Sequence, residues 1–225
     1  MVSKLTRAGV ALAALATLAG TAFAEGEWSA NVALTSDYVW RGISQSNEDP
    51  AISGGFDYAN GIFYAGTWAS NVDFQDEPED TNMEVDFYGG LASEFANGVT
   101  WDVGVIYYAY PDADTADYDF FEVYGGLGYD FDSGVSVGGK VSWDPDNQNV
   151  YIEGSAGYSF TDAFSVDATL GNYSFDAGGD YTNWSVGATY STPVGIDLGL
   201  RYWDTDIKAT SIAEDRVVFT ISKSM

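Results

Sequence analysis

The sequence contains no cysteine and no histidine among its 225 residues. Without cysteine the chain forms no disulfide bonds. Without histidine it cannot build a Ser-His-Asp hydrolytic triad, and it lacks the commonest metal ligand of proteins. Basic residues are also few: 8 Lys and Arg stand against 34 Asp and Glu, which gives a formal net charge of −26. Such a surface repels nucleic acid, so this class of partner is excluded.

Long apolar runs are confined to the N-terminus. Lys4 and Arg7 accompany a run of small residues and Leu at 8–19, and Ala22-Phe23-Ala24 is an A-x-A cleavage site. This pattern is typical of a secretory signal peptide, and the run is too short for a membrane-spanning helix. We therefore expect a signal peptide over residues 1–24. Residues 25–225 then form one domain, because no linker or change in composition interrupts them.

The periodicity of the remaining chain is that of β-strands. No long segment repeats apolar residues at helical spacing, whereas alternate residues are apolar almost throughout. Short connectors, several with the Asn-Gly or Ser-Gly chemistry of hairpin turns, alternate with longer acidic ones. The alternation predicts twelve strands, at residues 28–40, 51–58, 62–72, 83–95, 99–110, 120–131, 135–143, 150–160, 164–173, 183–190, 196–203 and 216–225.

Two all-β architectures fit this pattern: a soluble exported sandwich and a transmembrane antiparallel up-and-down barrel. The aromatic residues favour the barrel, because on the apolar face they gather at the strand ends, as interfacial girdles do in membranes. Beside the short turns these are Trp28, Tyr58, Phe95, Trp101, Tyr129, Phe131, Tyr158, Phe160, Phe164 and Tyr190. Beside the long connectors they are Tyr38, Trp40, Trp68, Tyr107, Phe121, Trp143, Trp184 and Tyr202.

An internal repeat supports the same interpretation. Residues 88–98 read YGGLASEFANG and residues 124–134 read YGGLGYDFDSG. We interpret each as one strand with its tight periplasmic turn. The Tyr points inward, the Leu and Phe point outward, and the last Gly supplies the positive φ of the turn. Ordinary hairpin convergence in any antiparallel protein would give the same repeat.

Three segments resemble a known family: SANVALTSDYVWRGISQSNEDPAISGGFDY at 29–58, FYAGTWASNVDF at 63–74 and DVGVIYYAYPD at 102–112. Together they are similar to the proteobacterial TorF family of porin-type proteins, also named Gcw_chp. The resemblance spans nearly the whole mature chain. It implies an outer-membrane barrel with pore activity, and it brings no substrate and no catalytic residues.

The predicted inward face carries more carboxylates than bases, which indicates a cation-favouring lumen. The alternative is that these groups only solvate the lumen, with some of them paired. We expect the pore to be lined by Asp37, Arg41, Glu84, Asp86, Asp102, Glu122, Lys140, Glu153, Asp167, Asp197 and Arg201, and we place Asp57, Glu94 and Asp130 on the same face.

Aromatic residues share this inward face: Tyr88, Tyr108, Tyr110, Tyr124, Tyr151, Tyr173 and Trp203. They could guide an amphipathic solute along the wall, or they could fill a small lumen and leave no continuous pore. A barrel of twelve strands lies between filled barrels of eight strands and open porins of sixteen, so both outcomes stay open.

The predicted function is a porin-like outer-membrane channel for passive diffusion of small solutes or ions, with a preference for cations. The alternative is a closed barrel that acts as a surface receptor, adhesin or structural protein. Outer-membrane lipid and lipopolysaccharide are the expected partners, and the sequence specifies no oligomeric state. No enzyme is predicted, because hydrolases of this architecture use a His-activated Ser.

We expect no cofactor and no metal site. The acidic stretches at 73–80, 112–119 and 144–147 are interpreted as solvated loops, although weak binding of divalent cations is an alternative. Residues 112–119 lack the fixed Gly and terminal Glu of an EF-hand.

Overall fold

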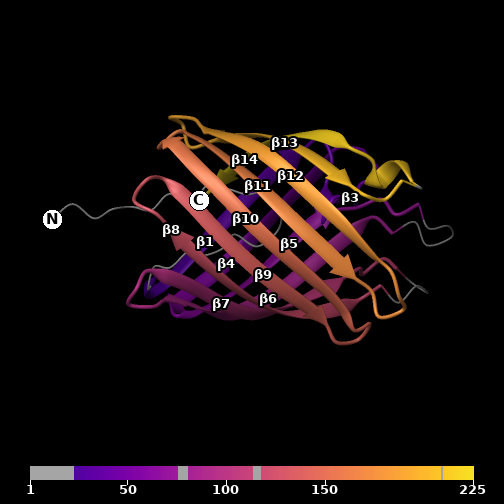
Figure 1. Ribbon diagram of the computed structural model, residues 1–225, viewed down its shortest axis with the longest axis horizontal. Helices are drawn as coiled ribbons and strands as arrows, with labels where there is room; N and C mark the ends of the chain where they lie inside the picture. The colour runs from indigo at the N-terminus through magenta and orange to yellow at the C-terminus, as the bar shows by residue number, and fades with distance from the viewer. Residues whose placement is uncertain (1–22, 76–80, 114–117, 209) are drawn as a thin grey trace.

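The computed structural model describes residues 23–75, 81–113, 118–208 and 210–225 (Figure 1). Twelve antiparallel strands close into one barrel in the ring order β1-β14-β13-β12-β11-β10-β9-β8-β7-β6-β5-β4. This confirms the predicted all-β barrel and its strand count. The barrel strands are β1 Phe23–Thr35, β4 Ala51–Gly61, β5 Phe63–Asn71, β6 Met83–Glu94, β7 Val99–Ala109, β8 Phe120–Asp130, β9 Val135–Asp144, β10 Asn149–Thr161, β11 Phe164–Ser174, β12 Asp180–Ser191, β13 Asp197–Thr205 and β14 Arg216–Ser224.

Closure of the ring depends on β1, which pairs with a strand on each side. Asn31 of β1 lies opposite Ser224 of β14 and opposite Gly55 of β4. Because closure leaves no free edge, every barrel strand has two hydrogen-bonded neighbours. The predicted signal peptide lies outside the described residues, except that Phe23 and Ala24 begin β1.

The barrel has two unlike ends, which we call the short-turn end and the long-loop end. The connectors 62, 95–98, 131–134, 162–163 and 192–196 lie at the short-turn end. At the long-loop end lie the described connector residues 36–50, 72–75, 81–82, 110–113, 118–119, 145–148, 175–179, 206–208 and 210–215. They include the small strands β2 (Val39–Trp40) and β3 (Ile43–Ser44) and the short helix η1 (Ser211–Ala213). In Figure 1 the long-loop end of the barrel lies to the right and the short-turn end to the left.

The outer surface of the barrel is apolar, as the alternation predicts. Val103 of β7 and Leu127 of β8 are 47% and 59% exposed, whereas inward Ile106 is 1% exposed. Among the described residues, no helix is long and apolar enough to cross a membrane. Many of the predicted girdle residues are exposed toward the strand ends, and these include Trp28, Phe95, Phe131, Phe160, Phe164 and Tyr190 at one end and Tyr107, Trp143 and Trp184 at the other. Phe56, Phe87 and Phe219 are exposed away from the strand ends, so aromatic side chains also occur in the band between the girdles.

The internal repeat has the predicted geometry. Tyr124 is buried inside the barrel, and Leu127 and Phe131 are exposed outside it. Gly98 and Gly134, which end the two copies, have φ values of +84° and +87°. Each copy is therefore one strand with its tight turn, and glycine is needed at the turn because L side chains rarely adopt such φ values.

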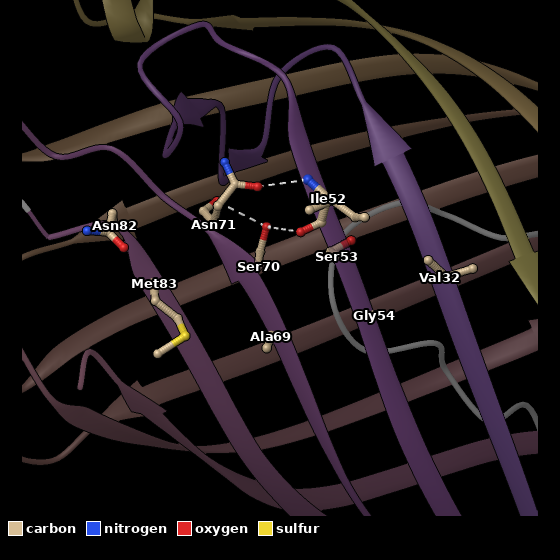
Figure 2. Close-up of a pocket in the computed structure, with 9 residues that line it drawn as sticks. All are labelled: Val32, Ile52, Ser53, Gly54, Ala69, Ser70, Asn71, Asn82 and Met83. Carbon is tan, nitrogen blue, oxygen red and sulfur yellow. Dashed lines mark hydrogen bonds between the residues drawn. The ribbon is translucent and has the colours of Figure 1, made fainter. Parts of the chain in front are cut away.

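A shallow groove of about 500 Å³ interrupts the outer surface near the long-loop end, across β1, β4, β5 and β6 (Figure 2). Val32, Ile52 and Met83 border it, and Gly54 and Ala69 contribute little volume. The Oδ1 atom of Asn71 accepts a hydrogen bond from the backbone N–H of Ile52, at 2.8 Å. The Asn71 side chain therefore provides a partner for a backbone N–H group at the start of β4.

Three predicted girdle residues do not lie on the outer surface. The strand predicted at 28–40 ends at Thr35, and the chain then turns into the barrel and carries Tyr38 and Trp40 inside. Trp68 also points inward. Gly61 and Ile62 form a two-residue turn that pairs Asn60 with Phe63, and this register reverses the face predicted for β5. Directly paired residues share a face, so Tyr64 lies inside with Ala59.

Candidate functional site: the barrel interior

The connector at 36–50, which we call the inner loop, folds into the barrel. Its strands β2 and β3 pair through Val39 with Ser44 and Trp40 with Ile43. The two residues between them, Arg41 and Gly42, have φ values of +50° and +85°. Two consecutive positive φ values are the geometry of a tight hairpin turn whose twist matches that of its strands. The inner loop therefore ends in a hairpin with Arg41 at its tip.

Arg41 forms the main contact between this tip and the wall. Its Nη1 and Nη2 donate to the two carboxylate oxygens of Glu122 on β8, at 2.8 and 2.7 Å. Its guanidinium carbon lies 4.1 Å from the ring centroids of both Trp40 and Tyr151, and 4.7 Å from that of Tyr173. Both partners of the ion pair are buried, with 6% and 2% of their side chains exposed. A bidentate pair between aromatic rings fixes the guanidinium in one orientation.

A local feature of the wall makes room for Tyr151. A Cβ added at Gly171, on the neighbouring strand β11, would clash with the hydroxyl oxygen of Tyr151. Only glycine allows the ring to lie flat against the sheet at this position. The flat ring then forms one of the surfaces on which the Arg41 guanidinium packs.

The base of the inner loop is attached to both sides of the barrel. Asp37 accepts hydrogen bonds from Arg216 Nη1 at 2.8 Å and from Ser44 Oγ at 2.6 Å. Val39 packs with Trp203 and Val218, on β13 and β14. On the opposite side, Tyr38 donates its hydroxyl hydrogen to Glu84 of β6, at 2.9 Å. The loop therefore crosses the lumen at the long-loop end.

Aromatic side chains complete this crossing. Trp40 lies edge-on to Tyr108, Phe120 and Tyr173, with centroids 5.9 to 6.4 Å apart. Tyr181 donates its hydroxyl hydrogen to the carbonyl oxygen of Arg41. The predicted inward aromatic residues do lie inside, and those around the inner loop form buried clusters rather than an open aromatic track.

The interior near the short-turn end is more accessible and more polar. Asp57, Asp102, Asp167 and Asp197 are partly exposed there. Asp102 accepts a hydrogen bond from Tyr64, which also bonds to Tyr124, and Asp57 accepts one from Tyr88. Asp167 pairs with Arg201 at 2.6 Å. Water-accessible carboxylates in this half keep a negative potential along the wall.

All the residues predicted to line the pore face the barrel interior. The structure brings Arg41 together with Glu122, and Arg201 with Asp167. Lys140 lies opposite Glu153 on the adjacent strand, with its Nζ 5.9 Å from the Tyr124 ring centroid. Glu94 and Asp130 end their strands at the short-turn rim and are exposed.

Sequence reasoning missed interior residues of two kinds. Arg216, a further interior base, was not assigned to the lumen, although its alternation with Val217 indicates that face. The predicted girdle places Tyr38, Trp40 and Trp68 on the lipid-facing surface, whereas these three side chains lie inside the barrel. For β5, the two-residue hairpin turn was a usable signal, because the register it imposes gives the correct face.

The acidic stretches are described in part. Residues 76–80 and 114–117 of two of them lie outside the described residues. In the third, Asp144 accepts hydrogen bonds from the backbone N–H groups of Asp146 and Asn147, both at 3.0 Å, and from the Asn147 side chain. The Asp144 carboxylate therefore closes a turn.

The family model Gcw_chp, described as a bacterial protein of unknown function, matches residues 19–225. The chain belongs to the Gcw_chp family. This confirms the resemblance noted in the sequence. No curated protein matches this Gcw_chp chain.

Solved porin structures have the same fold as this Gcw_chp protein. A KdgM porin matches with a TM-score of 0.64 and 7% identity, over 87% of this chain and 97% of the porin. KdgM in complex with disordered oligogalacturonate matches with a TM-score of 0.64 and 8% identity, over 88% and 99%. NanC porin matches with a TM-score of 0.58 and 12% identity, over 87% and 98%. The Gcw_chp chain therefore has the closed β-barrel fold of these porins.

Proposed function

We propose that this protein is a passive outer-membrane channel for small solutes, that it favours cations, and that its inner loop narrows the lumen. In this orientation the short turns face the periplasm and the long loops face the outside, as in bacterial outer-membrane barrels. The pore-lining set is the interior set named above, with Arg216 added. We assign the protein no catalytic role and no cofactor.

The observation that carries the proposal is the balance of charge inside the barrel. Three interior bases, Arg41, Arg201 and Arg216, are already paired with Glu122, Asp167 and Asp37. The inward carboxylates outside these pairs include Asp57, Glu84, Asp86, Asp102, Asp144, Glu153 and Asp197, and among the described residues Lys140 is the base that accompanies them. Fixed carboxylates in a narrow channel lower the energy of a passing cation and raise that of an anion.

The excess of interior carboxylates over bases predicts a different solute for this protein than for the KdgM porin. One KdgM structure contains oligogalacturonate, which is a polyanion. A wall with excess carboxylates repels a polyanion, so we expect this channel to exclude oligogalacturonate. Shared fold and different solute are compatible, because the strands set the scaffold and the inward side chains set selectivity.

Conductance in a planar bilayer under a gradient of potassium chloride tests the proposal. The reversal potential is expected to have the sign of a cation-selective pore, and the current should be unaffected by added oligogalacturonate. Anion selectivity at low salt would overturn the proposed preference.

A second function is favoured by the burial of the inner loop. The lumen around Arg41 and Trp40 is packed with buried side chains. If the purified protein carries no current while its strands are folded, the inner loop closes the barrel. The long loops then become the functional surface, as in a receptor, adhesin or structural protein.

A further inference from the structure

Lys140 differs from the other interior bases because, among the described residues, it forms no ion pair. Arg41, Arg201 and Arg216 each pair with a carboxylate. Lys140 lies on the inward face of β9 and is partly exposed, and its Nζ lies 5.9 Å from the ring centroid of Tyr124. A base without a pair keeps its electric field, so Lys140 can act on an ion inside the lumen.

The sheet register places Lys140 between two inward carboxylates. Lys140 lies directly opposite Glu153 on β10. On its other side it lies opposite Gly126 of β8, which in turn lies opposite Asp102 of β7. A Cβ added at Gly126 would lie 3.8 and 3.9 Å from the Cβ and Cγ of Lys140. The Lys140 side chain therefore lies along the row of the barrel wall that carries both carboxylates.

The two flanking carboxylates keep their negative charge. Asp102 accepts a hydrogen bond from the Tyr64 hydroxyl at 2.6 Å, and Glu153 accepts one from the Tyr151 hydroxyl at 3.0 Å. A phenol is a neutral donor, so these bonds hold the carboxylates in position without neutralising them. Both carboxylates are partly exposed, as is Lys140, so the three charges face the same interior space.

The net charge around Lys140 is small and negative. The other charged groups that act on Lys140 are Arg41 and Glu122, which neutralise each other in their bidentate pair. Two carboxylates against one ammonium leave a net charge of −1, and without the ammonium it would be −2. The energy of an ion in a given potential is proportional to the charge of the ion, so a divalent cation responds to this difference twice as strongly as a monovalent one.

We propose that Lys140 is a specificity-determining residue of the channel, whose ammonium acts as a fixed cation in the lumen and selects monovalent over divalent cations. The inference rests on the proposed cation channel and adds which cations it passes. Lys140 lies near the middle of β9 (Val135–Asp144), so a cation that crosses the barrel passes through its field. The ammonium offsets part of the carboxylate charge that would otherwise attract a divalent cation.

The permeability ratio of calcium to potassium tests the proposal, measured as a reversal potential with potassium chloride on one side of a planar bilayer and calcium chloride on the other. Lys140→Gln should raise this ratio about fivefold, as expected for one unit charge about 4 Å from the ion in a water-like dielectric. Lys140→Arg keeps the charge and should keep the wild-type ratio. The matched control is Lys208→Gln, the same change at a side chain that is 73% exposed at the long-loop end, and it should leave the ratio unchanged.

A rise of the ratio in Lys140→Gln, absent from Lys140→Arg and Lys208→Gln, supports the proposal. An unchanged ratio in Lys140→Gln overturns it, as does a rise in Lys140→Arg. An equal rise in Lys208→Gln also overturns it and assigns the selection to the loops. If Lys140→Gln does not fold, which the heat-dependent shift on a detergent gel shows, Lys140→Met replaces it with the same expected rise.

The same recordings separate the role of Lys140 from the proposed function. A cation-selective channel whose calcium ratio does not respond to Lys140→Gln refutes the role of Lys140 alone. An anion-selective wild-type channel whose calcium ratio still rises in Lys140→Gln refutes the proposed cation preference alone. A folded barrel that carries no current refutes both.

Discussion

The two halves of the barrel interior differ more than the sequences of their strands suggest. Near the long loops the inward side chains are buried, and the Arg41–Glu122 pair is enclosed by aromatic rings. Near the short turns the inward carboxylates, such as Asp102 and Asp197, are partly exposed. The same strands line both halves, so the strands do not cause the difference. The inner loop causes it, because it enters only the long-loop half.

This comparison separates two roles of interior charge. A carboxylate such as Glu122, buried against a base, stabilises the position of the inner loop and carries little net field. A carboxylate such as Asp102, which is hydrogen-bonded to Tyr64 and accessible to water, keeps its field and can act on a passing ion. Stability and selectivity should therefore respond to mutations in different halves.

Arg41→Ala is expected to have the largest effect on stability. Removing the guanidinium leaves Glu122 buried without its base, which costs about 3–5 kcal/mol for a buried ion pair. The inner loop loses its attachment to β8, so single-channel conductance should also rise. Denaturant unfolding in detergent or lipid measures the first effect, and bilayer recording measures the second.

The control for Arg41→Ala is Lys208→Ala. Lys208 pairs with Asp204 at 3.8 Å, but its side chain is 73% exposed. Solvent-exposed pairs contribute little, so this variant should unfold as the wild type does. Equal effects of the two variants would show that the inner loop is not fixed by the buried pair.

Val103→Arg tests the feature that the two halves share, their apolar outer surface. Val103 is exposed on β7 and lies near the middle of the strand. An arginine near the bilayer midplane costs about 2–4 kcal/mol in an outer-membrane barrel. We expect that loss in the free energy of unfolding measured in lipid bilayers. An unchanged value would mean that this surface does not face lipid.

Asp102→Asn should change selectivity more than stability. A unit charge about 4 Å from an ion changes its energy by about 1 kcal/mol in a water-like dielectric, so cation preference should fall by up to about fivefold. The reversal potential in a salt gradient measures this change. Asp146→Asn, at an exposed position in the connector 145–148, is the control and should leave the reversal potential unchanged. A larger effect of Asp146→Asn would assign selectivity to the loops.

The smallest expected effect is that of salt on the wild-type channel. The screening length falls from about 10 Å at 0.1 M salt to about 3 Å at 1 M salt, so the electric field of water-accessible carboxylates acts over a shorter distance. Cation preference should weaken over this range in the wild type and change less in Asp102→Asn. A preference independent of salt would indicate a dry selectivity site in the long-loop half.

The sequence by itself determined the strand count, the closed barrel class and most of the inward and outward assignments. Period-two alternation is a local property, so Val103 and Leu127 on the outer surface and Glu84 and Glu122 on the inner one could be read directly. The repeat ending in Gly98 and Gly134 likewise gave the tight turns, because positive φ is a local requirement.

Only the tertiary structure decided where the inner loop lies and what it closes. Tyr38 and Trp40 continue the alternation of β1, so sequence reasoning extended that strand beyond Thr35. After Thr35 the chain leaves the sheet, and Arg41 contacts Glu122 on β8, Tyr151 on β10 and Tyr173 on β11. These three partners are distant from Arg41 in sequence and come close to it only when the barrel is closed. Aromatic side chains suit both a lipid interface and a packed interior, so their type could not distinguish the two. Contacts across the closed barrel place Tyr38 and Trp40 in the interior rather than at the lipid interface.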